Sequence, residues 1–244
     1  QGFQIFGAVE NDAFGISVAL SRDMNGDGIG EILIGASGAD PGGRMLAGEV
    51  TVIYGQMESP TAIPTFPPTL RPTAESSPSP QPTPGARYID LYEWQNNSAL
   101  GFQVAGAGQG NQLGSSVCSA GDVNGDGYAD LLVRDPSSNS AYLIFGKAGG
   151  LADIYTGSAS FGGVEGIKIF GIPTLGYSVS GVGDFNGDGI DDFLVGAINY
   201  DASLPSRDDG GMAVILFGKT TGWDDIDMSS FTHIQSRISP DGSQ

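Results

Sequence analysis

The sequence has few of the residues from which catalytic and redox centres are built. It contains one cysteine, Cys118, and one histidine, His233. A single cysteine excludes an internal disulfide framework, and a zinc site of the Cys/His type lacks its ligands. We expect Cys118 to be a small core residue and His233 to be a surface or strand residue. The stretches GISVA, GSSVC and GYSVS begin like a nucleophile elbow but lack its closing glycine, and no phosphate-binding Walker motif occurs. We therefore predict that the chain is not an enzyme.

Basic residues and long apolar runs are also scarce. Ten Lys and Arg residues stand against 28 Asp and Glu residues, which gives a formal net charge of −18. Such an acidic chain repels nucleic acid, so we expect no nucleic-acid partner. No apolar run approaches the roughly 20 residues that a membrane-spanning helix needs. With 244 residues, the chain is nevertheless long enough to bury a sizeable core.

The most informative feature is an acidic segment that occurs three times. The copies are RDMNGDGIGEILIG at 22–35, GDVNGDGYADLL at 121–132 and GDFNGDGIDDFLVG at 183–196. In each copy, oxygen-bearing side chains stand at loop positions 1, 3, 5 and 9, and glycines that permit a sharp turn follow positions 3 and 5. Calcium takes six to eight oxygen ligands, often with a backbone carbonyl from position 7. The predicted ligands of three Ca²⁺ ions are Asp23, Asn25, Asp27, the Ile29 carbonyl and Glu31; Asp122, Asn124, Asp126, the Tyr128 carbonyl and Asp130; and Asp184, Asn186, Asp188, the Ile190 carbonyl and Asp192.

These loops differ from the calcium loop of an EF-hand. An EF-hand needs a bidentate Glu at position 12, where this chain has Ile34, Val133 and Val195. The residues after each loop form short apolar runs, which predict buried strands. We therefore expect the ninth-position acid to close each site from the first residue of a strand. The alternative is a polar Asp/Asn/Gly turn that binds nothing, although three copies of the full pattern argue against it. Magnesium fits less well, because it prefers to keep its waters in a near-ideal octahedron.

The repetition extends beyond the loops. FGISVAL, LGSSVCS and LGYSVSG precede them, and VTVIYG, AYLIFG and AVILFG follow them. Each unit thus predicts about four short antiparallel strands, the pattern of a β-propeller blade. We predict an all-β fold with three blades, arranged as an arc or as part of a larger ring. The predicted segments are a first blade at 1–58, a Pro/Ser/Thr-rich insertion at 59–87, a second blade at 88–150, a third at 151–220, and the start of a further blade at 221–244.

At this level of detail the sequence resembles a known family. The FG start, the calcium loop and the strands EILIGA and DDFLVGA resemble FG-GAP repeats, as in the β-propeller of integrin α subunits. The resemblance covers nearly all of the chain outside 59–87 and implies a role in adhesion. Two features depart from the pattern. VRDP at 133–136 replaces a Gly-Ala pair, and Glu31 stands where the family usually has Asp. Because Glu31 is longer, we expect the first loop to fit the pattern least well.

The insertion at 59–87 has a composition of its own. It holds nine of the 14 prolines, among many Ser and Thr residues. This composition favours extended polyproline II structure and is often O-glycosylated. We expect it to lie along a surface, held by glycans, neighbouring subunits or the propeller. Asn96 begins an Asn-Asn-Ser sequon and is a candidate for N-glycosylation.

These observations lead to one functional reading and two alternatives. We expect a non-catalytic calcium-binding propeller module in adhesion or in a structural assembly. Weak calcium sites fill outside the cell, so the expected location is extracellular or the cell surface. The alternatives are a lectin-like propeller, for which Trp94 and Trp223 stand at similar places in their units, and a non-catalytic domain of a larger secreted enzyme.

The number of repeats carries a further expectation. Three blades are too few for a ring, because propellers usually have four to eight. An open arc would expose unpaired strand edges, which natural proteins avoid. The chain begins and stops at one phase of the repeat, as a piece of a longer array would. We expect further blades of the same polypeptide, or failing that another protein chain, to complete the arc, with glycans as further partners.

Overall fold

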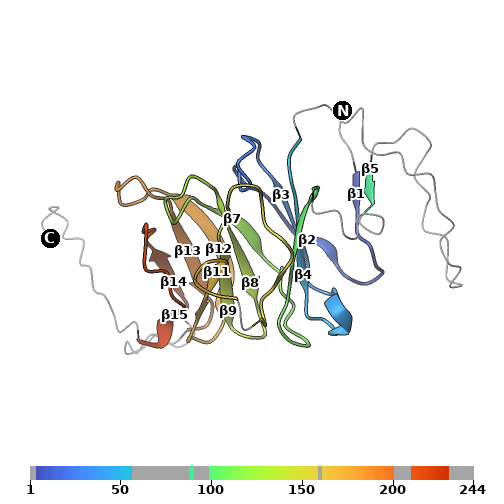
Figure 1. The fold of residues 1–244 in the computed structure, drawn as a ribbon. Coiled ribbons are helices and arrows are strands. Elements are labelled where there is room, and N and C mark those ends of the chain that lie inside the picture. The colour runs from blue at the N-terminus through green and yellow to red at the C-terminus, as the bar shows by residue number, and fades with distance from the viewer. Residues whose placement is uncertain (1–3, 57–87, 91–98, 159–160, 201–209, 231–244) are drawn as a thin grey trace, which may run out of the picture.

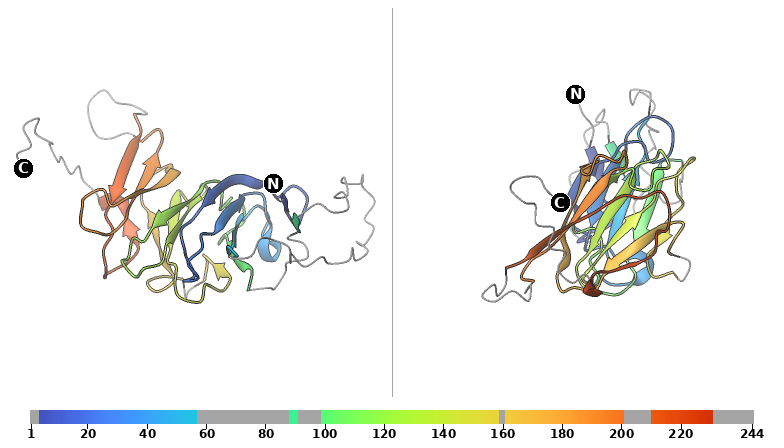
Figure 2. Two further views of the ribbon diagram at one scale, coloured as in Figure 1. Left: turned by 90° about the horizontal axis from the view of Figure 1, so that it is seen from above. Right: turned by 90° about the vertical axis from the view of Figure 1, so that its left-hand side faces the viewer.

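The computed structural model describes residues 4–56, 88–90, 99–158, 161–200 and 210–230. This part of the chain is all-β, as predicted. It forms four sheets, with two three-residue 3-10 helices, η1 (Pro41–Gly43) and η2 (Met228–Ser230). Neither described helix is long enough to cross a membrane. The three larger sheets lie side by side in a row, as Figures 1 and 2 show.

The first sheet has five strands around the first acidic loop. Strands β2, β3, β4 and β6 pair antiparallel in this order, and β10 adds a short parallel strand beside β6. From one edge to the other, the strands are β10 (Ile154–Tyr155), β6 (Gly101–Ala105), β4 (Glu49–Ile53), β3 (Ile32–Ala36) and β2 (Phe14–Leu20).

The second sheet repeats this arrangement around the second loop. Four antiparallel strands are again followed by a short parallel strand at the outer edge. Its strands are β15 (Ile226–Asp227), β11 (Gly166–Phe170), β9 (Ser140–Ile144), β8 (Asp130–Asp135) and β7 (Val117–Gly121).

The two remaining sheets match parts of the same pattern. The third sheet holds three antiparallel strands within the described residues, and the small sheet holds one parallel pair. The strands are β12 (Leu175–Gly183), β13 (Asp192–Ala197) and β14 (Met212–Leu216) in the third sheet, and β1 (Gln4–Phe6) with β5 (Tyr88–Asp90) in the small one.

The fourth antiparallel strand of each five-stranded sheet, β6 or β11, comes from the next unit of the chain. β6 lies in the segment 88–150, yet it pairs with β4 of the segment 1–58, with Thr51 opposite Gln103. β11 of the segment 151–220 joins β9 in the same way. Each five-stranded sheet therefore crosses the boundaries expected for the chain segments and joins consecutive units to one another.

The core lies between the sheets, because side chains alternate between the two faces of each strand. Leu131 in β8 packs with Leu33 of the first sheet in one buried cluster. The next residue, Leu132, faces the other way and packs with Phe193 of the third sheet in a second cluster. Cys118 is partly buried against this second cluster, and burial raises the pKa of its thiol to about 11. Cys118 is thus a core residue, as expected. His233 lies outside the described residues.

Candidate metal centres

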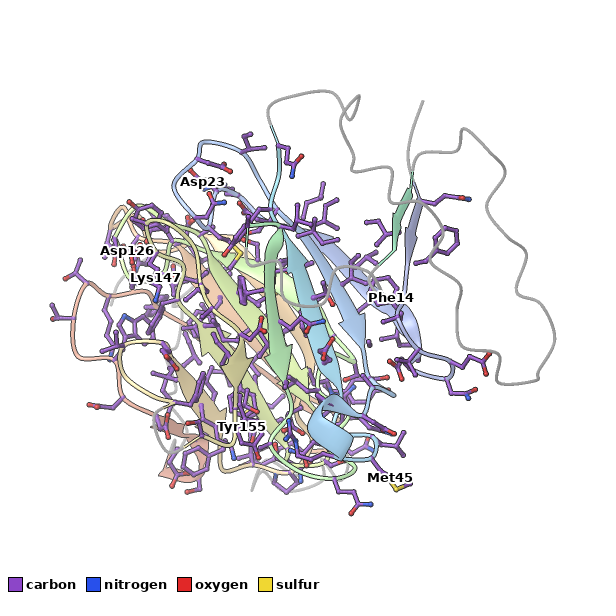
Figure 3. The ribbon with its side chains drawn as sticks, turned by 45° about the vertical axis from the view of Figure 1, so that its right-hand side comes forward. Phe14, Asp23, Met45, Asp126, Lys147 and Tyr155 are labelled. Carbon is purple, nitrogen blue, oxygen red and sulfur yellow. The ribbon has the colours of Figure 1, made fainter. Side chains whose placement is uncertain are left out.

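The three acidic loops connect β2 to β3, β7 to β8 and β12 to β13. We refer to residues 23–31, 122–130 and 184–192 as the first, second and third loops. They lie at one end of the sheets, and Figure 3 shows Asp23 and Asp126 there, at the opposite end from Met45 and Tyr155.

Backbone hydrogen bonds link these loops in series. The N–H of Ala129 donates to the Asp23 carbonyl at 2.8 Å, and the N–H of Asp191 donates to the Asp122 carbonyl at 3.1 Å. The first loop is therefore hydrogen-bonded to the second, and the second to the third.

The first residue of each loop organises the turn. In the first loop, Asp23 Oδ1 accepts hydrogen bonds from the N–H groups of Gly26 at 2.6 Å and Asp27 at 3.2 Å, and Oδ2 accepts one from Gly28 at 2.7 Å. Asp122 and Asp184 accept the equivalent bonds in their own loops. Burial acts to raise the pKa of Asp23, but the backbone hydrogen bonds outweigh it and lower this pKa below its ordinary value.

The paired glycines of each loop adopt left-handed backbone angles. Gly26 and Gly28 have φ of 87° and 84°, and the glycines of the other two loops have φ between 73° and 93°. Residues with a Cβ rarely adopt such angles. The Gly-Asp-Gly sequence therefore permits the sharp turn that points the loop side chains inward.

The third, fifth and seventh residues continue the same pattern. Asn25 Oδ1 accepts from the N–H of Asp27 at 2.9 Å, and Asp27 Oδ1 accepts from the N–H of Ile29 at 2.8 Å. The second and third loops repeat both bonds within 2.9 Å, through Asn124, Asp126 and Tyr128, and through Asn186, Asp188 and Ile190. All three loops thus hold their first, third and fifth side chains by equivalent hydrogen bonds.

The ninth residue is fully buried in all three loops. Asp130 and Asp192 are the first residues of β8 and β13, as expected, and Glu31 immediately precedes β3. Asp130 Oδ2 accepts from the N–H of Val123 at 2.9 Å, and its Oδ1 accepts from the N–H of Gly146 at 2.9 Å. The carboxylate of Asp130 therefore joins the loop to the Phe-Gly corner that follows β9.

Asp192 makes the corresponding contacts in the third loop. Its Oδ2 accepts from the N–H of Phe185 at 2.9 Å and its Oδ1 from the N–H of Gly218 at 2.8 Å. Gly146 and Gly218, which donate these bonds, were not among the predicted site residues. The aromatic–Gly pair that ends each unit is the sequence feature from which they could have been predicted.

Glu31 behaves differently from the two aspartates. Its Oε2 accepts from the N–H of Met24 at 3.0 Å, but its buried Oε1 has no hydrogen-bond partner among the described residues. Ligand oxygens of Asp23, Asp27 and Glu31 lie within 4.8 Å of one another, and the described residues contain no other group of three acids that meets this measure. The expectation that Glu31 makes the first loop the poorest fit is not reflected in this geometry.

Burial perturbs two of these ninth-position acids. Burial raises the pKa of Glu31 to about 7, and the negative charges of Asp23 and Asp27 raise it further, although the hydrogen bond from Met24 lowers it. Burial also raises the pKa of Asp130 to about 8, against two backbone hydrogen bonds. A buried carboxylate is costly without a compensating positive charge. The orphaned oxygen of Glu31 and the all-oxygen donor set fit a hard divalent cation.

Trp223 bears on the lectin-like alternative. Its ring centroid lies 5.5 Å from that of Phe145 and 6.5 Å from that of Phe193, and its Nε1 donates to the Lys219 carbonyl. The ring is partly buried against the second core cluster, so it does not form an exposed platform for a sugar. Trp94, the sequon at Asn96 and the insertion at 59–87 lie outside the described residues.

Comparison with known proteins identifies the repeat. The model of the FG-GAP repeat matches residues 14–53, 113–149 and 175–216. Integrin alpha pat-2 of Caenorhabditis elegans is 34% identical over 101 residues, which are 38% of this chain and 8% of the relative. Mouse integrin alpha-2 is 31% identical over 112 residues, 44% of this chain and 9% of the relative.

The matched ranges coincide with the sheets. Each spans the three strands that surround one acidic loop, so the three large sheets are β-propeller blades. The blades form an open arc within the described residues rather than a closed ring. The chain spans less than a tenth of the length of the integrin α chains it matches. With three repeats in the expected order and phase, the chain belongs to the FG-GAP repeat family and is related to integrin α chains.

Proposed function

We propose that this chain is a calcium-binding β-propeller module that acts in adhesion, or as a structural subunit, outside the cell or at its surface. The observation that carries the proposal is the recurrence of one loop geometry three times, with an unpartnered buried carboxylate oxygen in the first loop. The relationship to integrin α chains supports the adhesive role and the location. It also supports a non-catalytic function.

In each loop, the first, third, fifth and ninth side chains and the seventh carbonyl would hold the ion. Bound calcium neutralises the loop carboxylates and cross-links the turn. The protein's own contribution is to hold these oxygens in place. Asp23, Asp122 and Asp184 fix the turns, and the buried ninth acids connect them to the strands. Since the loops are hydrogen-bonded to one another, ion binding would stiffen one whole end of the module.

We also propose that further blades complete the arc. Two residues at the third blade, Phe185 and Phe217, are exposed although their counterparts in other blades are buried. Phe185 is 66% exposed, whereas Met24 and Val123 at the same loop position are 1% and 0% exposed. Phe217 is 55% exposed, whereas Phe145 is 5% exposed. An adjoining blade on this side would cover Phe185 and Phe217 as the third blade covers Val123 and Phe145.

The opposite end of the arc, at β2, also exposes apolar side chains. Ile16, Val18 and Leu20 alternate along β2 and are 56%, 69% and 77% exposed. Val117, the counterpart of Val18 in the second blade, is 7% exposed. The parallel pair of β1 with β5 matches the pairs of β6 with β10 and β11 with β15, which form the outer edges of blades. We propose that β1 is the outer strand of a preceding blade. The other strands of that blade would come from a longer polypeptide rather than from a second protein chain.

Calcium titration tests the central proposal. Chelator-treated protein is titrated with CaCl2 in a calorimeter, and native mass spectrometry counts the bound ions. We expect up to three ions per chain, with dissociation constants in the range of extracellular modules, about 10⁻⁴–10⁻³ M or tighter. Absence of calcium binding at 10 mM would contradict the proposal.

The adhesive role is tested by the attachment of cells to immobilised protein in calcium and in EGTA.

A further inference from the structure

Each acidic loop contains an Asn-Gly pair at its third and fourth positions. The pairs are Asn25-Gly26, Asn124-Gly125 and Asn186-Gly187. Asparagine is a chemically labile residue, and it deamidates most readily before glycine, which has no Cβ to keep its backbone nitrogen away from the asparagine side chain. The three pairs share this chemistry, so the structure around each pair decides whether it can react.

Deamidation begins when the backbone nitrogen of the glycine attacks Cγ of the asparagine. A new N–Cγ bond closes a five-membered succinimide ring, the Cγ–Nδ2 bond breaks, and the side-chain nitrogen leaves as ammonia with the proton of the glycine N–H. Water then opens the ring at either carbonyl, which leaves aspartate or isoaspartate. The peptide unit between the two residues must move for the attack to occur. Contacts that hold this unit in place therefore slow the reaction.

Within the loops, the three pairs are held alike. The N–H groups of Gly26, Gly125 and Gly187 donate to the first aspartate of their own loop at 2.6, 2.7 and 2.6 Å. The side-chain amide of each asparagine donates to the fifth residue of its loop at distances between 2.9 and 3.1 Å. A difference in reactivity among the pairs must therefore come from contacts outside the loop.

The second blade clamps the first loop at three carbonyls. The N–H groups of Ala129, Lys147 and Gly149 donate to the carbonyls of the first three residues of this loop, at 2.8, 3.0 and 2.7 Å. The bond from Gly149 ends on the carbonyl of Asn25, which belongs to the peptide unit that would have to move. The first Asn-Gly pair is thus restrained directly by a neighbouring blade.

The second and third loops have fewer of these bonds. In the second loop, the N–H groups of Asp191 and Lys219 donate to the carbonyls of Asp122 and Val123 at 3.1 and 2.9 Å. In the third loop, no donor among the described residues reaches the carbonyls of the first three positions. The restraint from outside therefore decreases from the first loop to the third.

Packing over the glycine decreases in the same order. A Cβ on Gly26 would lie 2.8 Å from the ring of Tyr128, and a Cβ on Gly125 would lie 3.1 Å from the side chain of Thr220. A Cβ on Gly187 would meet no described residue within 4 Å. The glycine of the third pair thus has the most space in which to move.

We infer that Asn186 is a deamidation site of this chain, and that Asn25 and Asn124 are protected by the blade that follows each of them. Asn186 is exposed, whereas the other two asparagines are half-buried. Because two or three more hydrogen bonds must break before a protected loop can open, we expect the reaction to be fastest at Asn186 and slowest at Asn25. A further blade of the kind proposed above would close this site.

Deamidation would alter the third loop itself. Nδ2 of Asn186 donates to Asp188 Oδ2 at 2.9 Å, and a carboxylate at this place would instead set two negative charges against each other. Isoaspartate would also add one carbon to the backbone next to Gly187. We therefore expect the reaction to loosen the third loop and to leave the other two intact.

Timed incubation of the chain tests this inference. Folded protein is kept in EGTA at mildly alkaline pH, and peptide mapping by mass spectrometry follows each asparagine separately. Labelling with an isoaspartate methyltransferase detects the second product. The same chain unfolded in urea gives the intrinsic rate of each pair. After division by these intrinsic rates, Asn186 should react roughly tenfold faster than Asn25 or more, since the first loop has three additional bonds to break.

Tyr128→Ala tests the protection of the first pair. Removal of the ring that covers Gly26 should speed deamidation at Asn25 and leave the rate at Asn186 unchanged. Cooperative thermal unfolding of the variant in EGTA is the folding control. An unchanged rate at Asn25 in the folded variant would mean that the ring gives no protection. If the variant does not fold, the three rates of the wild-type chain decide the inference alone.

The wild-type rates can overturn the inference in two ways. Equal corrected rates at the three asparagines would show that the neighbouring blades do not protect them. An Asn186 that stays intact while the urea-unfolded chain reacts would show that the third loop is closed. Because every incubation contains EGTA, neither result bears on calcium binding, and the proposed function would stand.

Discussion

The guanidinium group of Arg134 lies over the ring of Tyr177, with Cζ 4.5 Å from the ring centroid. Arg134 is in β8 of the second blade and Tyr177 is in β12 of the third, so this cation–π contact joins two blades. Gly35 and Gly196 hold the equivalent position in the other blades. A Cβ on Gly35 would collide with the carbonyl of Gly114, and a Cβ on Gly196 would lie 2.6 Å from Ser178 Oγ. The departure at VRDP is thus accommodated by a contact that the other blades lack.

Removal of this contact should weaken the interface between the second and third blades. We expect Arg134→Ala to lower the free energy of unfolding by about 1 kcal/mol, in line with the usual range of cation–π contacts. A double-mutant cycle with Tyr177→Leu, measured by urea denaturation, should give a coupling energy of about 0.5–2 kcal/mol. Strictly additive effects of the two substitutions would mean that the stacking contributes nothing to stability.

Chelation should destabilise the folded module. A ligand that binds the native state alone stabilises it by about 2.7 kcal/mol when its free concentration is a hundredfold above Kd. We therefore expect the melting temperature to fall in excess EGTA. Asp126→Ala removes one predicted ligand of the second loop. It should therefore reduce the calcium-dependent rise in melting temperature, but only by the contribution of that one site. Identical melting curves with calcium and with EGTA would count against ion binding by the loops.

The glycine at the Phe-Gly corner should not tolerate a side chain. Gly146→Ala would bring a Cβ into the carbonyl oxygen of Ala129, and it would disturb the N–H that bonds to Asp130. We expect a loss of about 1–3 kcal/mol of unfolding free energy, as overpacking usually costs. Gly108→Ala is the matched control. Its Cβ would approach the side-chain oxygen of Asn111 at 3.0 Å, and that side chain can move. Equal stability of the two variants would show that the corner is less tight than the structure indicates.

The stability of the module should depend on pH through Glu49. This carboxylate accepts a hydrogen bond from Gln103 at 2.8 Å, and burial, with Asp12 and Asp153 nearby, raises its pKa to about 7. Because the folded state binds the proton more tightly than the unfolded state, the stabilising effect is complete below pH 4.5. It is lost as the pH rises through 7.

Glu49→Gln should remove the part of this pH dependence that comes from Glu49, while Glu31 and Asp130 contribute equally in both proteins. At pH 8 the variant should be more stable than the wild type by on the order of 1–3 kcal/mol, since one pKa unit corresponds to about 1.4 kcal/mol. At pH 4.5 the two proteins should be nearly equal in stability. Urea denaturation at both values, in one buffer with EGTA, measures the difference. A difference that stays constant between pH 4.5 and pH 8 would exclude Glu49 as the source.

Local sequence was sufficient to predict the loops, their flanking strands and the family. Position 1 of each loop, the paired glycines and the strand that begins at Asp130 or Asp192 all depend on contacts within a few residues. Such contacts are set by side-chain type and spacing, which a sequence displays directly. The calcium ligands of the loops, glycosylation at Asn96 and the behaviour of 59–87 stay predictions.

Tertiary structure decided which parts of the chain complete one another. The pairing of Thr51 with Gln103 spans the whole Pro-rich insertion, and no local pattern specifies such a partner. The same holds for Asp130 with Gly146, and for Arg134 with Tyr177. At Glu31 the sequence showed a glutamate in place of the usual aspartate, but it did not show where the second carboxylate oxygen would lie. That position depends on the hydrogen-bond donors around the oxygen, and only folding brings those donors together.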